Sequence, residues 1–297
     1  MSVVEADPPA ADRPGLAAAW IVGAILSFAA MAVAGRELSA ELDTFEIMAY
    51  RSTLGFPVVA VALLWREGWR GAATAQPGRH AVRNVIHFAG QNAWFYGVAT
   101  IPLAQLVALE FTNPIWVALL APLLLGEALT WRKVAAAALG FAGVLVIAQP
   151  GVAPLDWGHA AGLGAALGFA LTNVFTKGLT RRDSLLCVLF WMTTSQMVMG
   201  IAFAAPGGVT LISAERAPWV AFVGLCGLTA HFSLTRALTL APASVVAPME
   251  FARLPVIAVV GMLLYGEPLE IAVLAGAALI LAGNTANLLP ARRRPRG

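Results

Sequence analysis

The chain has 297 residues, of which 59% are hydrophobic and only 12% are charged, with a formal net charge of +3. A soluble globular domain carries about 25% charged residues, so this chain has too few of them to cover a surface that faces water. The composition excludes an ordinary soluble domain and predicts a protein that mostly faces lipid. The small positive charge does not indicate nucleic-acid binding, because the basic residues follow a membrane topology.

Ten apolar stretches are each close to the roughly 20 residues that a transmembrane helix needs. In chain order they are 16–35, 44–64, 82–99, 103–125, 133–149, 158–178, 185–204, 218–238, 243–264 and 271–289. Their apolar runs exclude a membrane barrel, whose strands alternate apolar and polar residues. Residues 1–15 are expected to form a disordered cytoplasmic tail, and residues 291–297 a basic cytoplasmic tail.

The positive charges predict how the chain is oriented. With ten spans and a cytoplasmic N-terminus, 15 of the 19 Lys and Arg residues fall in cytoplasmic segments and two, Arg36 and Arg216, fall in outer loops. Cytoplasmic loops of membrane proteins carry an excess of Lys and Arg, so this distribution supports both the count and the orientation. We expect an integral protein of a bacterial cytoplasmic (inner) membrane with both termini in the cytoplasm.

Two segments of the chain repeat each other. Residues 102–143 and 242–283 align without a gap and are identical at 15 of 42 positions. They divide the chain into two units of five spans, 16–149 and 150–290. Because five is odd, the second unit must be inverted relative to the first, as in transporters that bind substrate where two repeats meet. The predicted fold is an all-α membrane protein of ten transmembrane helices as two inverted five-helix repeats.

Motifs shared by the two repeats resemble those of a known family. Each repeat has a Glu-Phe pair followed by a Gly-Glu pair, at Glu110-Phe111 and Gly126-Glu127, and again at Glu250-Phe251 and Gly266-Glu267. With the glycine-rich segment that follows, the order resembles the EamA-type transporters of the drug/metabolite transporter superfamily. The resemblance implies a central cavity lined mainly by the first, third, fourth, sixth, eighth and ninth helices. It also implies a substrate such as an amino acid, S-adenosylmethionine, riboflavin or another metabolite.

Charged side chains inside the apolar spans are candidates for the site, because a charge at the bilayer centre costs about 2.5–3.5 kcal/mol. Glu110 and Glu250 are repeat mates in the fourth and ninth spans. Arg253 lies three residues after Glu250, so these two are candidates for an ion pair on one helix face. Glu110 has no such neighbour, and Arg51 is its candidate counter-ion. An unpaired Glu110 would bind substrate or carry a proton, whereas a structural role is the alternative for both glutamates.

Other polar and aromatic residues inside the spans extend this set. His87 and His231 join Glu110 as proton-coupling candidates, because histidine titrates near neutral pH, although packing histidines are the alternative. Trp94 and Phe95 follow an amide pair and suit a small zwitterion with an apolar side chain, unless they only pack. The predicted substrate-binding residues are Glu110, Gln91, Asn92, Trp94, Phe95, Asn113, Asn173, His231 and Glu250.

Prolines and glutamates also mark helix breaks and helix ends. Pro114 lies four residues after Glu110 and removes a helical hydrogen bond, and Pro255 lies five residues after Glu250, so we expect both spans to be kinked. Glu127 and Glu267 are placed at helix ends, where a carboxylate can accept hydrogen bonds from free backbone N–H groups.

These patterns predict a secondary transporter or facilitator that moves small metabolites by alternating access. Amino-acid export, including that of aromatic or other neutral amino acids, is the leading prediction. Uptake of a larger metabolite such as S-adenosylmethionine or riboflavin is the alternative, and a non-transporting scaffold or an intramembrane enzyme is a remote one. The expected partners are a small-molecule substrate and the lipid bilayer, not nucleic acid.

The sequence contains no pattern for enzyme chemistry. It has no phosphate-binding loop, nucleophile elbow or metal-ligand spacing, so we expect no enzymatic activity, no cofactor and no metal site. The two cysteines, Cys187 and Cys226, fall in separate spans and are expected to be buried and reduced.

Overall fold

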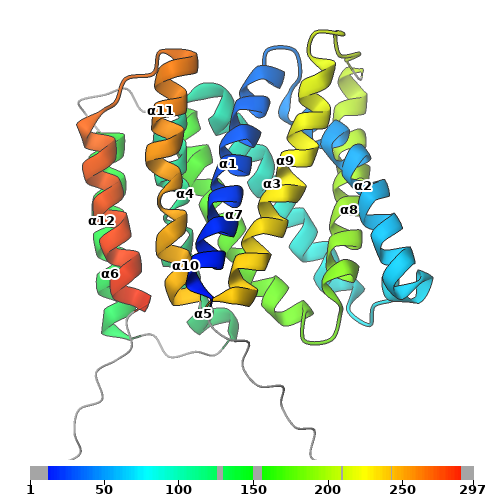
Figure 1. The fold of residues 1–297 in the computed structure, drawn as a ribbon, viewed down its shortest axis with the longest axis horizontal. Helices are drawn as coiled ribbons and strands as arrows, with labels where there is room; N and C mark the ends of the chain where they lie inside the picture. Colours follow the sequence, from blue (N-terminus) through cyan, green and yellow to red (C-terminus); the bar gives the residue numbers. More distant parts are fainter. Residues whose placement is uncertain (1–12, 126–129, 150–155, 209, 242, 289–297) are drawn as a thin grey trace, which may run out of the picture.

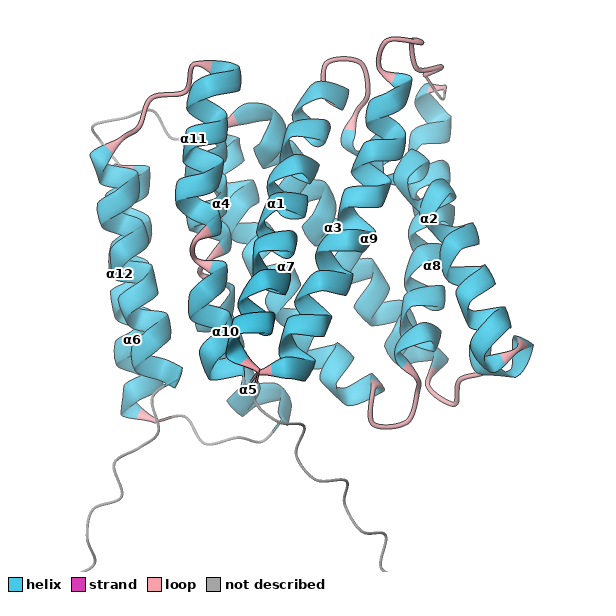
Figure 2. Cartoon of the chain, in the orientation of Figure 1, coloured by secondary structure: helices cyan, strands magenta, loops and turns pink. Residues whose placement is uncertain are grey.

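The chain folds into helices that run between two faces of the molecule (Figure 1). The computed structural model describes residues 13–125, 130–149, 156–208, 210–241 and 243–288. Within these ranges the regular structure is helical and there is no strand (Figure 2), which confirms the predicted fold class. Most of each tail, together with the Gly126-Glu127 motif, lies outside the described residues.

Ten spans become twelve α-helices in the described ranges, because one span of each half is broken. The first half contains α1 (Pro14–Leu38), α2 (Thr44–Glu67), α3 (Pro77–Thr100), α4 (Leu103–Glu110), α5 (Asn113–Leu125) and α6 (Trp131–Ala148). The second half contains α7 (Trp157–Leu179), α8 (Leu185–Ala204), α9 (Ala217–Leu240), α10 (Ala243–Glu250), α11 (Arg253–Tyr265) and α12 (Ile271–Leu288). Short 3-10 helices, η1 (Trp69–Ala72) and η2 (Ala205–Gly207), follow α2 and α8.

Hydropathy alone detects only some of these spans. Five described stretches are long and apolar enough to cross a membrane, at Gly15–Leu38, Thr44–Glu67, Leu103–Leu120, Leu185–Gly207 and Ala217–Ala237. Three shorter apolar helices are Lys133–Ala148, Arg253–Tyr265 and Ile271–Ala286. The helix α3 is less apolar because it buries polar side chains, among them Arg83, His87 and Gln91. It also begins five residues earlier than the predicted 82, at Pro77, where the missing N–H of proline costs no helical hydrogen bond.

The two broken spans are interrupted at the Glu-Phe motif of each repeat. The helix α4 ends at Glu110 and α5 begins at Asn113, while α10 ends at Glu250 and α11 begins at Arg253. Both predicted kinks are therefore confirmed. In the first break, the carbonyl oxygen of Phe111 accepts a hydrogen bond of 2.9 Å from Nδ2 of Asn284 in α12. A side chain thus satisfies a backbone group that the break releases, as backbone polar groups within a membrane require.

The most extensive helix packing is between the two halves. The four most extensively packed pairs are α1 with α9, α3 with α7, α2 with α8, and α6 with α12. The α6–α12 pair lies at one side of the molecule and the α2–α8 pair at the other, with the remaining two pairs between them (Figure 1). Exchanging the two repeats exchanges α1–α9 with α7–α3 and leaves the other pairs unchanged. The packing therefore has the symmetry expected of two inverted repeats.

Glycine lets the paired helices approach closely. A Cβ atom on Gly143 of α6 would lie 2.5 Å from the carbonyl oxygen of Gly276, and a Cβ on Gly276 of α12 would lie 2.5 Å from that of Gly143. In the α3–α7 pair, a Cβ on Gly168 would lie 3.0 Å from the Cα of Gly90. Small residues at helix crossings are typical of proteins in lipid, where close van der Waals packing drives association.

The predicted orientation can be tested by chemical labelling. A cysteine at Asp156 or Glu215 should react with a membrane-impermeant thiol reagent in intact cells, whereas one at Gly78 or Arg182 should react only after permeabilisation. The reason is the distribution of Lys and Arg, which predicts that the last two positions lie in the cytoplasm. Positions 182 and 215 are exposed, so a lack of reaction would not be due to burial. Labelling of position 182 in intact cells would contradict the orientation.

Candidate functional site

A cavity of about 330 Å³ lies at the centre of the molecule, between the two repeats. This volume is within the range of small-molecule sites, about 300–1,000 Å³. The cavity brings together most of the residues selected from the sequence: Arg51, His87, Gln91, Trp94, Phe95, Glu110, Asn113, Asn173, His231, Glu250 and Arg253. They come from α2, α3, α4, α5, α7, α9, α10 and α11, so neither repeat forms the site alone.

Glu110 forms an ion pair across the two repeats. Its Oε1 lies 2.7 Å from Nη2 of Arg253, and its Oε2 accepts a hydrogen bond of 2.9 Å from Nε1 of Trp94. The side chains of Glu110 and Arg253 are only 15% and 9% exposed. The expectation that Glu110 is unpaired is therefore wrong. Arg253 is its partner, in place of the same-helix pair with Glu250 that the sequence suggested.

The reason for this pairing is the break between α10 and α11. Glu250 is the last residue of α10 and Arg253 the first of α11, so they do not share one continuous helix. A spacing of three residues places two side chains on one face only within a continuous helix. The guanidinium of Arg253 instead lies 4.9 Å from the ring centre of Phe28 and 5.0 Å from that of Phe111. These contacts and Glu110 hold the cation at the meeting point of α1, α4 and α11.

Two further charged side chains face the cavity. Glu250 and Arg51 both line it, and neither forms an ion pair within the described part of the chain. Nη1 of Arg51 instead lies 3.9 Å from Sδ of Met48. The predicted contact between Arg51 and Glu110 is not among the described ion pairs. Because charges inside a membrane protein are costly, these two side chains are candidates for substrate contacts.

The polar face of α3 forms part of the cavity wall. His87 and Gln91, four residues apart, line the cavity, and Gln91 accepts a hydrogen bond from Gln196 of α8. Asn92 does not line it, and its Nδ2 donates instead to the carbonyl oxygen of Phe88 at 2.8 Å. The assignment of Asn92 to the site is therefore not supported by its position. It follows Gln91 directly, and consecutive helical residues point in different directions.

Amide groups and helix ends line another part of the cavity. Asn113, the first residue of α5, donates from Nδ2 to the carbonyl oxygen of Ala166 at 3.1 Å, and its Oδ1 accepts from Nδ2 of Asn173 at 3.4 Å. The N-terminal ends of α5 and α11 both reach the cavity, through Asn113 and Arg253. The N-terminus of a helix carries partial positive charge, so this part of the cavity favours electronegative atoms of a ligand.

The cavity also contains residues that the sequence did not select for the site. They are Phe28, Met31, Phe111, Pro114, Phe169, Thr172, Leu234, Phe251 and Asn284. A signal existed for two of them, because Phe28 and Phe169 occupy matching positions 141 residues apart in the two repeats. Asn284 is a polar residue in the apolar last span, which is the same type of signal that identified Glu110.

At the predicted outer ends of the helices, Arg36 near the end of α1 connects α1 to α3 and to the segment between α11 and α12. Arg36 donates to the carbonyl oxygens of Val98 and Ile101, at the end of α3, and forms an ion pair of 3.1 Å with Glu267. Oε2 of Glu267 in turn accepts the backbone N–H of Leu103, the first residue of α4, at 2.9 Å. We call these contacts the outer clamp. They confirm that Glu267 binds a free backbone N–H group, whereas its repeat mate Glu127 lies outside the described residues.

Two inverted repeats of membrane-spanning helices around a shared central cavity define a membrane transporter of the inverted-repeat class. The chain belongs to the EamA-like transporter family, within the drug/metabolite transporter superfamily, and the match covers residues 15–149 and 156–288. One match thus falls on each repeat.

Curated relatives include transporters with named substrates. The chain is 31% identical over 291 residues to a riboflavin transporter of Rhizobium johnstonii, covering 96% of this chain and 94% of the relative. It is 29% identical to a riboflavin transporter of Brucella anthropi, over 76% of this chain and 82% of the relative. An S-adenosylmethionine uptake transporter of Rickettsia felis is 24% identical over 88% of each chain. A crystal structure with a TM-score of 0.62 and 20% identity, covering 91% of this chain and 96% of its own, shares the fold.

Proposed function

We propose that this chain takes up riboflavin, or a similar planar heteroaromatic metabolite, across the cytoplasmic membrane by alternating access. The observation that carries the proposal is the central cavity, where aromatic rings and hydrogen-bonding side chains from both repeats face one volume. Similarity over nearly the whole chain to a riboflavin transporter supports the same substrate class.

The cavity matches the chemistry of a flavin. Riboflavin is uncharged and combines a flat ring system, rich in carbonyl and ring-nitrogen acceptors, with a hydroxylated chain. Phe28, Phe111 and Phe251 provide apolar ring faces, and the helix ends at Asn113 and Arg253 provide donors for the acceptors. The amides of Gln91 and Asn173 can both donate and accept, which suits hydroxyl groups. An apolar pocket with a few placed polar groups is the common form of such sites.

S-adenosylmethionine is a second candidate substrate. It carries a sulfonium and an amino group, and Glu250 faces the cavity without an ion-pair partner among the described residues. That carboxylate favours a cationic ligand, and the relative from Rickettsia felis supports it. Amino-acid export, the leading prediction from the sequence, stays a prediction, because the named relatives given above support the alternative instead.

The substrate is tested by transport into liposomes that contain the purified protein. Uptake of labelled riboflavin should exceed that of protein-free liposomes and should be reduced by unlabelled riboflavin. Labelled S-adenosylmethionine and a panel of neutral amino acids, each with and without a pH gradient, form the comparison. Transport of amino acids without transport of riboflavin would contradict the proposal. The measurements with and without a pH gradient also test proton coupling, for which Glu110, His87 and His231 remain the candidates.

A further inference from the structure

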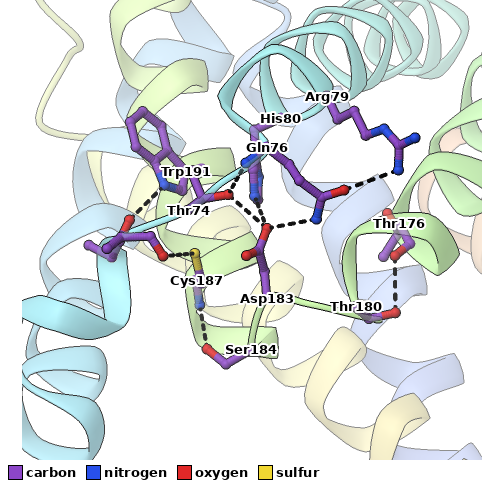
Figure 3. Close-up of polar contacts among 12 residues, drawn as sticks. Thr74, Gln76, Arg79, His80, Thr176, Thr180, Asp183, Ser184, Cys187 and Trp191 are labelled. Carbon is purple, nitrogen blue, oxygen red and sulfur yellow. Dashed lines mark hydrogen bonds and ion pairs between the residues drawn. The ribbon is translucent and has the colours of Figure 1, made fainter.

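A second cluster of functional side chains lies away from the cavity, at the predicted cytoplasmic face. His80 is in the first turn of α3, Asp183 in the connection between α7 and α8, and Cys187 in the first turn of α8. One nitrogen, one carboxylate oxygen and one sulfur from these residues all lie within 4.8 Å of one another. Figure 3 shows the three side chains meeting below the start of α3.

Asp183 is the centre of the cluster. Its Oδ2 lies 2.9 Å from Nε2 of His80, accepts a hydrogen bond of 2.8 Å from Thr74 and a longer one from Gln76. Burial by itself would raise the pKa of Asp183, but the hydrogen bonds from His80 and Thr74 lower it below its ordinary value. Asp183 is therefore a carboxylate at neutral pH. The described hydrogen bonds all reach Oδ2, which leaves Oδ1 available as a ligand.

The hydrogen bonds leave other atoms of the cluster unsatisfied. His80 and Cys187 are each only 1% exposed, and Nδ1 of His80 has no hydrogen-bond partner within the described residues. Leaving a buried polar group unpaired costs about 1–3 kcal/mol. Among the described residues, the polar contact of Cys187 Sγ is a 4.0 Å contact with the carbonyl oxygen of Ala73. The nitrogen of His80 that faces Asp183 is Nε2, so an ion held here would use Nε2 of His80 together with Oδ1 or Oδ2 of Asp183 and Sγ of Cys187.

We propose that His80, Asp183 and Cys187 form a binding site for a divalent metal ion of the zinc type. Imidazole nitrogen, carboxylate oxygen and thiolate sulfur are the three ligand types that Zn²⁺ accepts in proteins, and a cysteine ligand disfavours Mg²⁺ and Ca²⁺. The fourth position would be taken by water or by a nearby oxygen of the connection that precedes α3. Arg181, Arg182 and Ser184 are exposed in the same connection as Asp183, so the cluster lies next to the aqueous face of the molecule.

A bound ion would connect two parts of the fold. It would join the start of α3, whose later residues line the cavity, to the start of α8, which packs against α2. The Cys187 thiol would lose its proton on binding, so affinity should rise with pH. Sequence spacing does not reveal the site, because His80 and Asp183 are 103 positions apart.

Cobalt provides the test, because Co²⁺ occupies zinc sites and absorbs light when it binds thiolate. Tag-free full-length protein, purified in detergent and treated with a chelator, is titrated with Co²⁺. We expect a single equivalent to bind, with a thiolate-to-cobalt band in the near ultraviolet and visible bands of tetrahedral intensity, and we expect Zn²⁺ to remove them. Absence of these bands in the wild-type protein would overturn the proposal, whatever the variants do.

The two native cysteines provide a matched control. Both are buried, but only Cys187 belongs to the cluster. The near-ultraviolet band should be lost in Cys187→Ser and retained in Cys226→Ser, and His80→Gln should weaken Co²⁺ binding by at least about tenfold, the effect of losing roughly 1.4 kcal/mol. Each variant is first checked by size-exclusion chromatography and circular dichroism. A band that survives Cys187→Ser, or that disappears in folded Cys226→Ser, would show that the ion binds elsewhere.

Discussion

Glu110→Gln should destabilise the protein far more than Glu250→Gln. In the first variant the guanidinium of Arg253 loses the carboxylate that lies 2.7 Å away, inside a largely buried site. Removing one partner of a buried ion pair costs about 3–5 kcal/mol, because the other charge is left uncompensated. Glu250 interacts with Arg253 at longer range but makes no ion pair within the described residues, so its replacement leaves the Arg253–Glu110 pair intact. Thermal unfolding of the two purified variants in the same detergent measures the difference.

A second substitution distinguishes the effect of leaving Arg253 without its partner from other effects of Glu110→Gln. Glu110→Gln combined with Arg253→Met removes both charges and keeps an apolar side chain beside Phe28 and Phe111. The double variant should recover most of the lost stability, since replacing a whole buried pair by apolar groups is often neutral. If Glu110→Gln were as stable as Glu250→Gln, the pair would not contribute to stability. If the double variant were no more stable than Glu110→Gln, the loss of stability would have another cause, for example the lost hydrogen bond from Trp94.

The fold could be predicted from the sequence because the features that determine it are either short sequence patterns or patterns that occur in both repeats. Apolar runs indicate the spans, and Pro114 and Pro255 mark the two broken ones. The gapless match of 102–143 with 242–283 shows two repeats, and the odd number of spans in each repeat makes them inverted. The central position of Glu110 and Glu250 follows from the same repeat. These signals need no knowledge of which helices pack together.

The pairing of side chains could not be predicted in the same way. Helical spacing suggested Glu250 as the partner of Arg253, but the break between α10 and α11 separates them. The actual partner, Glu110, is 143 positions away and comes close only because the repeats pack against each other. Asn92 shows a different limit, since polarity alone does not tell which side of α3 faces the cavity. His87 and Gln91, four residues apart, lie on the side of α3 that lines the cavity, and Asn92 lies outside it.

The second large expected effect concerns the outer clamp and access to the cavity. Glu267→Gln should make the cavity easier to reach from outside. Glu267 accepts from Arg36 at 3.1 Å and from the backbone N–H of Leu103 at 2.9 Å, so it holds α1 against the start of α4. We expect these contacts to separate when the cavity opens toward the outside. Removing about 1.4 kcal/mol from the closed state would raise the open population about tenfold.

Reactivity of a cysteine inside the cavity measures this opening. Met31 lines the cavity five residues before Arg36 in α1, so modification of Met31→Cys by a reagent added outside reports access to the cavity. In a Cys226→Ser background, an impermeant thiol reagent should modify that cysteine about tenfold faster when Glu267→Gln is added. Glu270→Gln is the matched control, because Glu270 follows in the same connection but accepts only from Gln105 among the described side-chain contacts. Equal rates in the Glu267 and Glu270 variants would show that the clamp does not control access from this face.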